Sequence, residues 1–287
     1  MRLVVLVTGA NGQLGQALQH IASGYAEIDF VFCDSKTLDI TDKAAIQSQF
    51  EKYKPDFCIN AAAYTAVDKA EQESEKAIAI NTTAAQYLAE VCDEFNAQLL
   101  HVSTDFVFDG LAEKPYVETD LPNPQSVYGQ TKLDGEKAIQ AVFGAYFIVR
   151  TSWVYSQFAG NFMKTMLRLG AQRDSLSVVD DQIGTPTHAV DLAHALVQII
   201  LFASKNPDHQ AHGLYHFSNE GSCSWFEFAT KIFEVNNISI DLKPIPSSSY
   251  PTPAQRPKYS VLDKSKIKTV FGISIKSWED SLRNTEL

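Results

Sequence analysis

Residues 3–15 read LVVLVTGANGQLG, a short apolar run that passes directly into a glycine-rich turn. A continuous apolar run of this length is typical of a strand buried on both faces. A helical pattern through Leu18 and Ile21 follows the turn and ends near Gly24. A strand, a glycine turn and a helix in this order predict the first unit of a dinucleotide-binding fold, in which the helix N-terminus offers N–H groups to phosphate oxygens.

The three glycines of this turn have separate predicted roles. Gly9 allows the tight turn, Gly12 lets the backbone approach a pyrophosphate, and Gly15 packs the helix against the strand. Asp34 ends the next predicted strand 19 residues after Gly15, and a carboxylate at this spacing bonds an adenosine ribose in such folds. The glycine spacing is GxxGxxG and not the commoner GxGxxG, so a glycine turn in another kind of βα unit is the alternative.

Further apolar runs continue the alternation of strands and helices. Strands are predicted over 28–33, 57–59, 98–103 and 146–150, with helical patterns between them. This alternation predicts an α/β fold with a doubly wound, Rossmann-like parallel sheet. Beyond Thr151 the regularity weakens, which indicates a smaller mixed C-terminal substrate-binding lobe, and the proline-rich stretch 243–257 is predicted to be irregular. We expect a dinucleotide-binding domain over 1–155, completed by 185–218, and a substrate-binding lobe over 156–184 and 219–287.

Composition argues against several classes of function. The chain has 287 residues, 45% of them hydrophobic, and a net charge of -10 without a basic run, so neither nucleic acid nor an anionic membrane is expected as a partner. The four cysteines form no CxxC pair and the seven histidines show no metal-ligand spacing, so free thiols and no metal site are expected. No apolar stretch approaches the roughly 20 residues of a membrane span. These features predict a soluble cytoplasmic protein.

Two short stretches follow predicted strands at the carboxyl edge of the sheet, where ligands of open α/β folds bind. The small residues Ala61, Ala62 and Ala63 would leave room for a cofactor, or would only pack closely. Asp39 and Ile40 could enclose an adenine ring, and the alternative is that they mark the start of the next helix.

A hydroxyl, a phenol and an ammonium group follow in the same half of the chain. Thr104 comes directly after the fourth predicted strand, and Tyr128 and Lys132 stand four residues apart, on one face of a helix. Such a set can reduce a ketone: Thr104 bonds the carbonyl oxygen, Tyr128 donates a proton, and Lys132 stabilises the phenolate and holds the nicotinamide ribose. The charge of Lys132 is expected to lower the pKa of Tyr128. For YxxxK alone, a surface tyrosine and lysine is the alternative.

With these features the chain resembles the extended short-chain dehydrogenase/reductase family, and within it the dTDP-4-dehydrorhamnose reductases. The motifs that carry the resemblance are TGANGQLG (8–15), NAAAYTAVDKAE (60–71), STDFVFDG (103–110), VYGQTKLDGE (127–136), RTSWVY (150–155) and YPTPAQRPKYSVLD (250–263). The resemblance implies reduction of the C4 ketone of dTDP-4-dehydro-L-rhamnose with NADPH or NADH. Asp34 favours NADH, whereas Ser35 and Lys36 could hold the 2′-phosphate of NADPH, so both cofactors are expected.

The resemblance also implies roles for single residues. The matching catalytic residues are Thr104, Tyr128 and Lys132. Together with the glycine turn, the expected cofactor-binding residues are Gly9, Asn11, Gly12, Gln13, Leu14, Gly15, Asp34, Asp39, Ile40, Ala61, Ala62, Ala63, Tyr64, Thr65, Tyr128 and Lys132. The resemblance implies Val67, Thr104, Asp105 and Trp153 as substrate-binding residues, and Arg256 and Asn161 are further candidates for binding the substrate diphosphate. Without the resemblance, Trp153 could be a core residue and Arg256 a solvated one, although a guanidinium can grip a diphosphate bidentately.

Two departures from the family pattern bear on these expectations. Phe106 stands where the family commonly has tyrosine, which removes a hydroxyl near the substrate. Gln16 and Ala17 stand where a glutamate would help to bind magnesium at a dimer interface, so no metal is predicted, and a homodimer is one alternative for the assembly.

Other functions of the same fold are alternatives to reduction of the rhamnose precursor. A dehydratase usually needs two carboxylic acids after the threonine, and Asp105-Phe106 supplies one. An epimerase or another nucleotide-deoxysugar ketoreductase is closer to the pattern. A non-catalytic binding subunit, like the regulatory partner of methionine adenosyltransferase, is the alternative from another class, and an intact Thr104, Tyr128 and Lys132 argues against it.

Overall fold

A six-stranded parallel sheet is the centre of the computed structural model, which describes residues 2–285. The strands lie in the order β10-β5-β4-β3-β1-β2. Their bounds are β1 Leu3–Thr8, β2 Ile28–Cys33, β3 Phe57–Asn60, β4 Gln98–Thr104, β5 Tyr146–Thr151 and β10 Gly213–His216. The strand order reverses between β1 and β3, and ligands of such sheets bind outside the carboxyl ends of the strands at this point.

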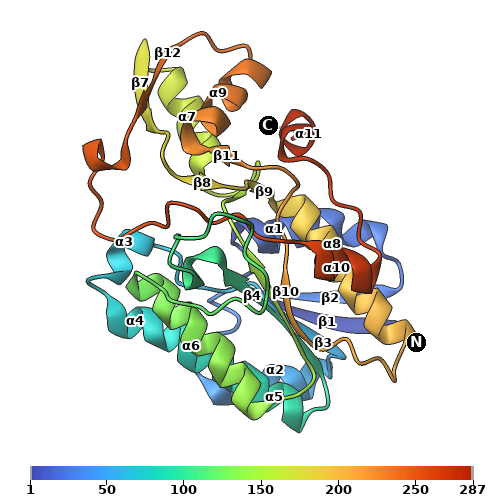
Figure 1. The fold of residues 1–287 in the computed structure, drawn as a ribbon. Helices are drawn as coiled ribbons and strands as arrows, with labels where there is room; N and C mark the ends of the chain where they lie inside the picture. Colours follow the sequence, from blue (N-terminus) through green and yellow to red (C-terminus); the bar gives the residue numbers. More distant parts are fainter. Residues whose placement is uncertain (1, 286–287) are drawn as a thin grey trace.

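Helices cover both faces of the sheet (Figure 1). One face packs against α1 (Gln13–Ile21), α8 (Ala189–Lys205) and α10 (Ser265–Phe271), and the other against α2 (Lys43–Tyr53), α5 (Ala84–Glu94) and α6 (Val127–Val142). The predicted α/β class with a doubly wound parallel sheet is therefore confirmed.

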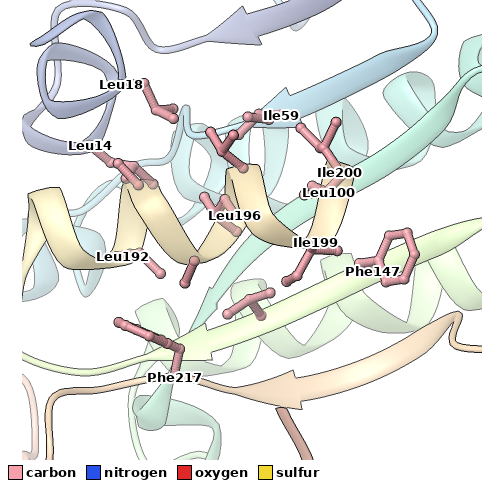
Figure 2. Close-up of a cluster of buried hydrophobic side chains, with 14 of the residues drawn as sticks. Leu14, Leu18, Ile59, Leu100, Phe147, Leu192, Leu196, Ile199, Ile200 and Phe217 are labelled. Atoms are coloured by element: carbon pink, nitrogen blue, oxygen red, sulfur yellow. The ribbon is translucent and has the colours of Figure 1, made fainter. Parts of the chain in front are cut away.

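Helix α8 lies in the centre of the larger hydrophobic core because its sequence is apolar on most sides. Leu192, Leu196, Ile199 and Ile200 are fully buried between the sheet and α1 (Figure 2). Each buried side chain of this size contributes about 1.5–3 kcal/mol to folding. This packing holds the start of α1, and with it the glycine turn, against the carboxyl end of the sheet.

A smaller mixed lobe lies beyond the carboxyl edge of the sheet (Figure 1). It is built from α7 (Phe162–Gly170), α9 (Trp225–Val235), α11 (Trp278–Arg283), β7 (Ser175–Val179), β12 (Asp241–Ile245), β8 (Ile183–Gly184) and β11 (Cys223–Ser224). The short strands β6 (Val154–Tyr155) and β9 (Thr187–His188) pair where the chain passes between the sheet and the lobe. Phe228, Ile232 and Trp278 belong to the separate core of the lobe.

The irregular structure predicted for 243–257 is wrong at its beginning. Strand β12 continues through Pro244 to Ile245 and pairs in parallel with β7. Proline is tolerated there because β12 pairs on one side only, so its other edge needs no N–H donor.

The helical pattern predicted between the strands at 57–59 and 98–103 is interrupted in the structure. Helix α4 (Ser74–Ile78) continues through a π-helical turn (Ala79–Thr83) into α5, and Ile78 is 46% exposed. In the π turn, the Asn81 side chain accepts from the Tyr64 N–H at 2.9 Å and donates to Thr131 Oγ1 at 3.1 Å. The turn thus holds the stretch after β3 and the helix α6 together, and π turns of this kind are frequent beside functional sites.

The segment 265–275 was expected in the substrate-binding lobe, but it packs against the sheet. Ile267 and Ile273 belong to the same hydrophobic core as α8. The described cysteines are all buried free thiols, as predicted. None of the helices within residues 2–285 has the length and apolar character that a membrane span requires.

Candidate active site

The carboxyl ends of β1, β3, β4 and β5 bring the predicted site residues to one edge of the sheet. The parallel register pairs Thr8 with Asn60 and Thr104 with Thr151. The glycine turn, the alanines after β3 and Thr104 therefore lie side by side, although their positions span almost a hundred residues of sequence.

The glycine turn has the conformation that its sequence predicts. Gly9 has φ +68°, and a Cβ there would lie 2.7 Å from the backbone nitrogen of Ala62, so only glycine fits. Gly12 precedes α1, and the described residues place no side-chain cap on that helix. The N–H groups of the first turn of α1 thus stay available to phosphate oxygens.

Asp34 is held in one orientation at the end of β2. Its Oδ1 accepts from the backbone N–H groups of Lys36 and Thr37, at 3.1 and 3.0 Å, and its Oδ2 accepts from Asn11 Nδ2 at 2.9 Å. The hydrogen bonds from Thr37 hold the pKa of Asp34 below its usual range. An ionised, oriented carboxylate fits the predicted contact with a ribose hydroxyl, which stays a prediction.

Asp39 and Ile40 have local structural roles. Asp39 Oδ1 accepts from Thr41 N and Thr41 Oγ1 at 2.9 and 2.7 Å, and the Ile40 side chain is buried in the core beside α2. This arrangement matches the helix-start interpretation. Contact with adenine stays a prediction for both residues.

Helix α6 carries Tyr128 and Lys132 to the end of β4. Ser126 caps the helix by accepting from the Gly129 N–H at 3.1 Å. A Cβ at Gly129 would overlap the carbonyl oxygen of Phe106, so the glycine lets α6 press against the turn after β4. This close approach brings the hydroxyl of Thr104 near the phenol of Tyr128, where it acts on the pKa of Tyr128.

The pKa of Tyr128 is raised, contrary to the expectation from its sequence. Burial raises the pKa to about 12, the hydrogen bond with Thr104 lowers it, and the charge of Asp105 raises it further. The ring of Phe106 packs edge-on against that of Tyr128, with the ring centroids 5.5 Å apart, and adds to this burial. Tyr128 is therefore a neutral phenol in the ligand-free protein, which is the form that can donate a proton.

Lys132 is fully buried and has two partners on β4. Its Nζ donates to the carbonyl oxygen of Val102 at 2.7 Å and lies 3.2 Å from His101 Nε2. Burial lowers the pKa of Lys132 to about 8, and the charge of Glu136 opposes this shift. Burial thus brings the pKa of Lys132 closer to neutral pH.

Asp105 adds a second titratable group beside Tyr128. Its Oδ1 accepts from Thr104 Oγ1 at 3.1 Å, and its buried Oδ2 has no partner within residues 2–285. Burial raises the pKa of Asp105 to about 6. A carboxyl oxygen without a partner can accept a hydrogen bond from a hydroxyl group of a ligand.

A buried ion pair joins α6 to β5. This pair was not predicted from the sequence. Arg150 of β5 donates to Glu136 through Nε and Nη2, at 2.9 and 2.6 Å, and Ser103 Oγ donates to the same carboxylate. Both side chains are almost fully buried. The pair fixes α6 one turn after Lys132, and only the fold brings these residues together.

The lobe forms a cavity of about 960 Å³ between α7, β7 and the segment 245–256. Its walls include Phe162, Met166, Trp225, Tyr250 and Arg256. Trp225, which the sequence did not single out, stacks on Trp153 with ring centroids 3.5 Å apart and planes at 8°. The stack extends the aromatic wall of the cavity to Trp153.

Two other predicted substrate residues, Arg256 and Asn161, lie at different places in the structure. Arg256 lines the cavity and binds Asp68, the neighbour of Val67 on α3 (Val67–Ala70). Asn161 caps α7 and donates to Gln13 Oε1 at 2.9 Å and to Ser156 O at 2.7 Å. The Asn161 side chain is thus engaged within the protein, and we do not propose it as a substrate ligand.

Of the remaining predicted cofactor residues, Tyr64 and Thr65 differ in exposure. The Tyr64 ring is buried and its hydroxyl donates to Glu73 at 2.9 Å, whereas Thr65 is exposed. Any contact of Tyr64 with a cofactor would therefore come from its backbone.

Comparisons with known proteins agree with this geometry. The family model described as RmlD substrate binding domain matches residues 1–285. A dTDP-4-dehydrorhamnose reductase of Aggregatibacter actinomycetemcomitans is 42% identical over 289 residues, covering 98% of this chain and 97% of the relative. The spore coat polysaccharide biosynthesis protein SpsK of Bacillus subtilis (strain 168) is 40% identical, with 97% and 95% covered.

A crystal structure of dTDP-4-dehydrorhamnose reductase from Bacillus anthracis in complex with NADP matches with a TM-score of 0.94 and 40% identity, covering 99% of both chains. The resemblance predicted from the sequence motifs is confirmed. The glycine turn, the residues at the end of β4 and on α6, and these full-length matches show that the chain belongs to the RmlD substrate binding domain family.

Proposed function

We propose that this chain reduces the C4 ketone of dTDP-4-dehydro-L-rhamnose to dTDP-L-rhamnose with NADPH, and also accepts NADH. The observation that carries the proposal is the gathering of Thr104, Tyr128 and Lys132 at the carboxyl edge beside a glycine turn that fits a pyrophosphate. Full-length relatives named dTDP-4-dehydrorhamnose reductase and a neighbouring structure in complex with NADP support it.

The bound cofactor would supply a hydride to C4 of the sugar. Tyr128, held neutral by burial, donates its proton to the oxygen that develops charge at C4, and Thr104 donates a hydrogen bond to the same oxygen. When protonated, Lys132 stabilises the phenolate that remains on Tyr128 and binds the nicotinamide ribose. Glu136 and Arg150 keep the helix that carries both residues in place.

The cavity in the lobe suits the nucleotide end of the substrate. Its aromatic and apolar walls, with Phe162, Met166 and Trp225, can receive a flat base, and Arg256 at its edge can bind a diphosphate bidentately. Asp105 Oδ2, which is buried without a partner among the described residues, can accept a hydrogen bond from a sugar hydroxyl. We therefore assign Trp153, Asp105, Val67 and Arg256 to the substrate side.

We also propose the division into domains with one change. Residues 1–155 and 185–218 form the dinucleotide-binding domain, and the packing of Ile267 and Ile273 against α8 supports adding 265–275 to it. The remaining parts of 156–184 and 219–287 form the substrate-binding lobe.

Turnover with defined sugar nucleotides tests the proposed reaction. Purified protein mixed with NADPH and dTDP-4-dehydro-L-rhamnose should consume reduced nicotinamide and yield dTDP-L-rhamnose, identified by NMR. The dTDP-linked ketone should be preferred over UDP- and GDP-linked 4-keto sugars, and each is assayed with NADPH and NADH. Tight NADPH binding without turnover of any keto sugar would instead favour a non-catalytic binding subunit.

A further inference from the structure

A row of buried polar side chains crosses the sheet and ends at the catalytic lysine. Strand register places Thr8, Asn60 and His101 side by side on β1, β3 and β4, and each is 1% exposed. Thr8 Oγ1 donates to Asn60 Oδ1 at 2.7 Å, Asn60 Nδ2 lies 3.0 Å from His101 Nδ1, and His101 Nε2 lies 3.2 Å from Lys132 Nζ. This polar row connects the residue before the glycine turn with Lys132.

The backbone N–H of Ala62, a donor that cannot rotate, sets the direction of the hydrogen bonds in the polar row. The backbone N–H of Ala62 lies 3.3 Å from Asn60 Oδ1, and the Thr8 hydroxyl donates to the same oxygen. They orient the Asn60 amide so that its NH₂ group faces His101 Nδ1, which must then accept. A neutral His101 therefore carries its proton on Nε2 and directs it at Lys132.

This direction is compatible with only one charge state of Lys132. An ammonium group has donors and no acceptor, so it would oppose the Nε2–H of His101, whereas a neutral amine can accept from it. Burial lowers the pKa of His101 well below its usual range, so the imidazolium form does not resolve the conflict. A charged Lys132 requires His101 to carry its proton on Nδ1 and Asn60 to turn its amide over.

We propose that the polar row of Thr8, Asn60 and His101 sets the protonation state of Lys132, so that the lysine charge, the histidine tautomer and the asparagine amide change together. Asn60 and His101 are thus positioning residues. When Asn60 turns, the Ala62 N–H keeps only Thr8 Oγ1, at 3.3 Å, as its acceptor. Proton uptake by Lys132 is in this way linked to the backbone beside the glycine turn.

Other charged and titratable groups lie near Lys132. Glu136 follows one turn later on α6 and is bound by Arg150 of β5, and Asp105 and Tyr128 lie on the catalytic side. The inference goes beyond the proposed reaction and rests on it only for the role of Lys132 at the nicotinamide ribose.

Nitrogen NMR of the ligand-free protein tests the coupled change directly. Across a titration from about pH 6 to about pH 10, His101 should be the Nδ1–H tautomer at low pH and the Nε2–H tautomer at high pH. The carbon shift of Lys132 Cε should change with the same midpoint, and Lys132→Met assigns that signal. One His101 tautomer at every pH would overturn the inference.

Two substitutions should move the midpoint of the Lys132 Cε signal in opposite directions. Asn60→Asp can only accept, which locks His101 as the Nδ1–H tautomer and should raise the midpoint by about one pH unit or more; His101→Leu removes the acceptor and should lower it by about as much. Ile148→Val, at the register partner of His101 on β5, is the control for a small packing defect and should not shift the midpoint. Shifts in one direction, or none, would contradict the inference.

NADPH binding gives a second measurement that needs no sugar nucleotide. The pH at which NADPH affinity falls should move up in Asn60→Asp and down in His101→Leu. The reason is that a charged Lys132 forms stronger hydrogen bonds to the ribose than a neutral amine does. If the protein failed to reduce any sugar but showed the tautomer change, the proposed reaction would be wrong and this inference would stand. Normal turnover with a single His101 tautomer would overturn this inference and leave the proposed reaction standing.

Discussion

Arg256 donates to both carboxylate oxygens of Asp68, at 3.0 and 2.8 Å, and this pair joins the proline-rich segment of the lobe to helix α3. The arginine holds the pKa of Asp68 below its usual range. Both side chains are partly exposed, at 27% and 40%, so a ligand can reach the guanidinium. The pair therefore holds Arg256 in one orientation at the rim of the cavity.

Arg256→Ala should raise the KM for the dTDP-sugar about 10- to 100-fold with little change in kcat, because charge-assisted bonds to a diphosphate are lost while the reacting groups are untouched. Steady-state kinetics with varied sugar nucleotide measures this. Arg168→Ala, which removes an exposed arginine of α7 outside the cavity, is the matched control. An unchanged KM in Arg256→Ala would remove the diphosphate role.

Tyr128→Phe should lower kcat about 10²- to 10⁴-fold, because the phenol is the proposed proton donor. The Kd for NADPH, measured by fluorescence quenching, should stay close to that of the unaltered protein. Tyr53→Phe removes a hydroxyl at the end of α2, far from the site, and should leave both values unchanged. Near-normal kcat in Tyr128→Phe would mean that another group donates the proton.

Lys132→Met should weaken NADPH binding about 10-fold or more and lower kcat as well, because hydrogen bonds from a charged group to the ribose are lost. Lys137→Met changes an exposed lysine of the same helix and serves as the control. The decisive comparison is the NADPH Kd of the two variants by calorimetry. Equal affinities would separate Lys132 from the ribose.

Asp105→Asn should change how stability depends on pH. The pKa of Asp105 is raised to about 6 in the folded protein. The stability that its protonated carboxyl group contributes is therefore complete below the unfolded pKa of ~3.9 and is lost as the pH rises through about 6. Above pH 6 the ionised group costs about 3 kcal/mol, which the variant avoids. Urea unfolding at several pH values should show the variant gaining stability relative to the unaltered protein between about pH 4 and pH 7.

The control for this pH effect is Asp109→Asn. Hydrogen bonds, first that from the Leu111 N–H, hold the pKa of Asp109 below its usual range, so the same substitution there should act in the opposite direction. Asp109 contributes stability above its unfolded pKa that is lost as the pH falls. If Asp105→Asn showed the same pH dependence as the unaltered protein, the buried carboxyl would not be titrating near pH 6.

Glu136→Gln should destabilise the fold by about 3–5 kcal/mol, because it leaves the guanidinium of Arg150 buried without its counter-charge. Chemical unfolding measures the loss. Asp29→Asn breaks the exposed pair with Arg2 and should have no measurable effect. A Glu136→Gln variant as stable as Asp29→Asn would show that the buried pair does not hold α6.

Much of the site could be predicted because it follows strand ends. Thr104 was found from its place after a predicted strand, and Tyr128 and Lys132 from helical spacing. No role was predicted for His101, Asn60 or Trp225, because each looks ordinary in its own segment. Trp225 gains its place from a stack on Trp153, which is 72 positions earlier in the chain, and His101 from a register across three strands.

The sequence by itself determined the α/β alternation, the glycine turn and the order of the three proposed catalytic residues, because these depend on spacings of a few residues along one segment. Only the tertiary structure decided the charge states, because burial depends on all surrounding segments. It raises the pKa of Tyr128 where the sequence predicted a decrease, and lowers that of Lys132. It also decided which distant groups meet, as in the pair of Arg256 with Asp68 and the contact of His101 with Lys132.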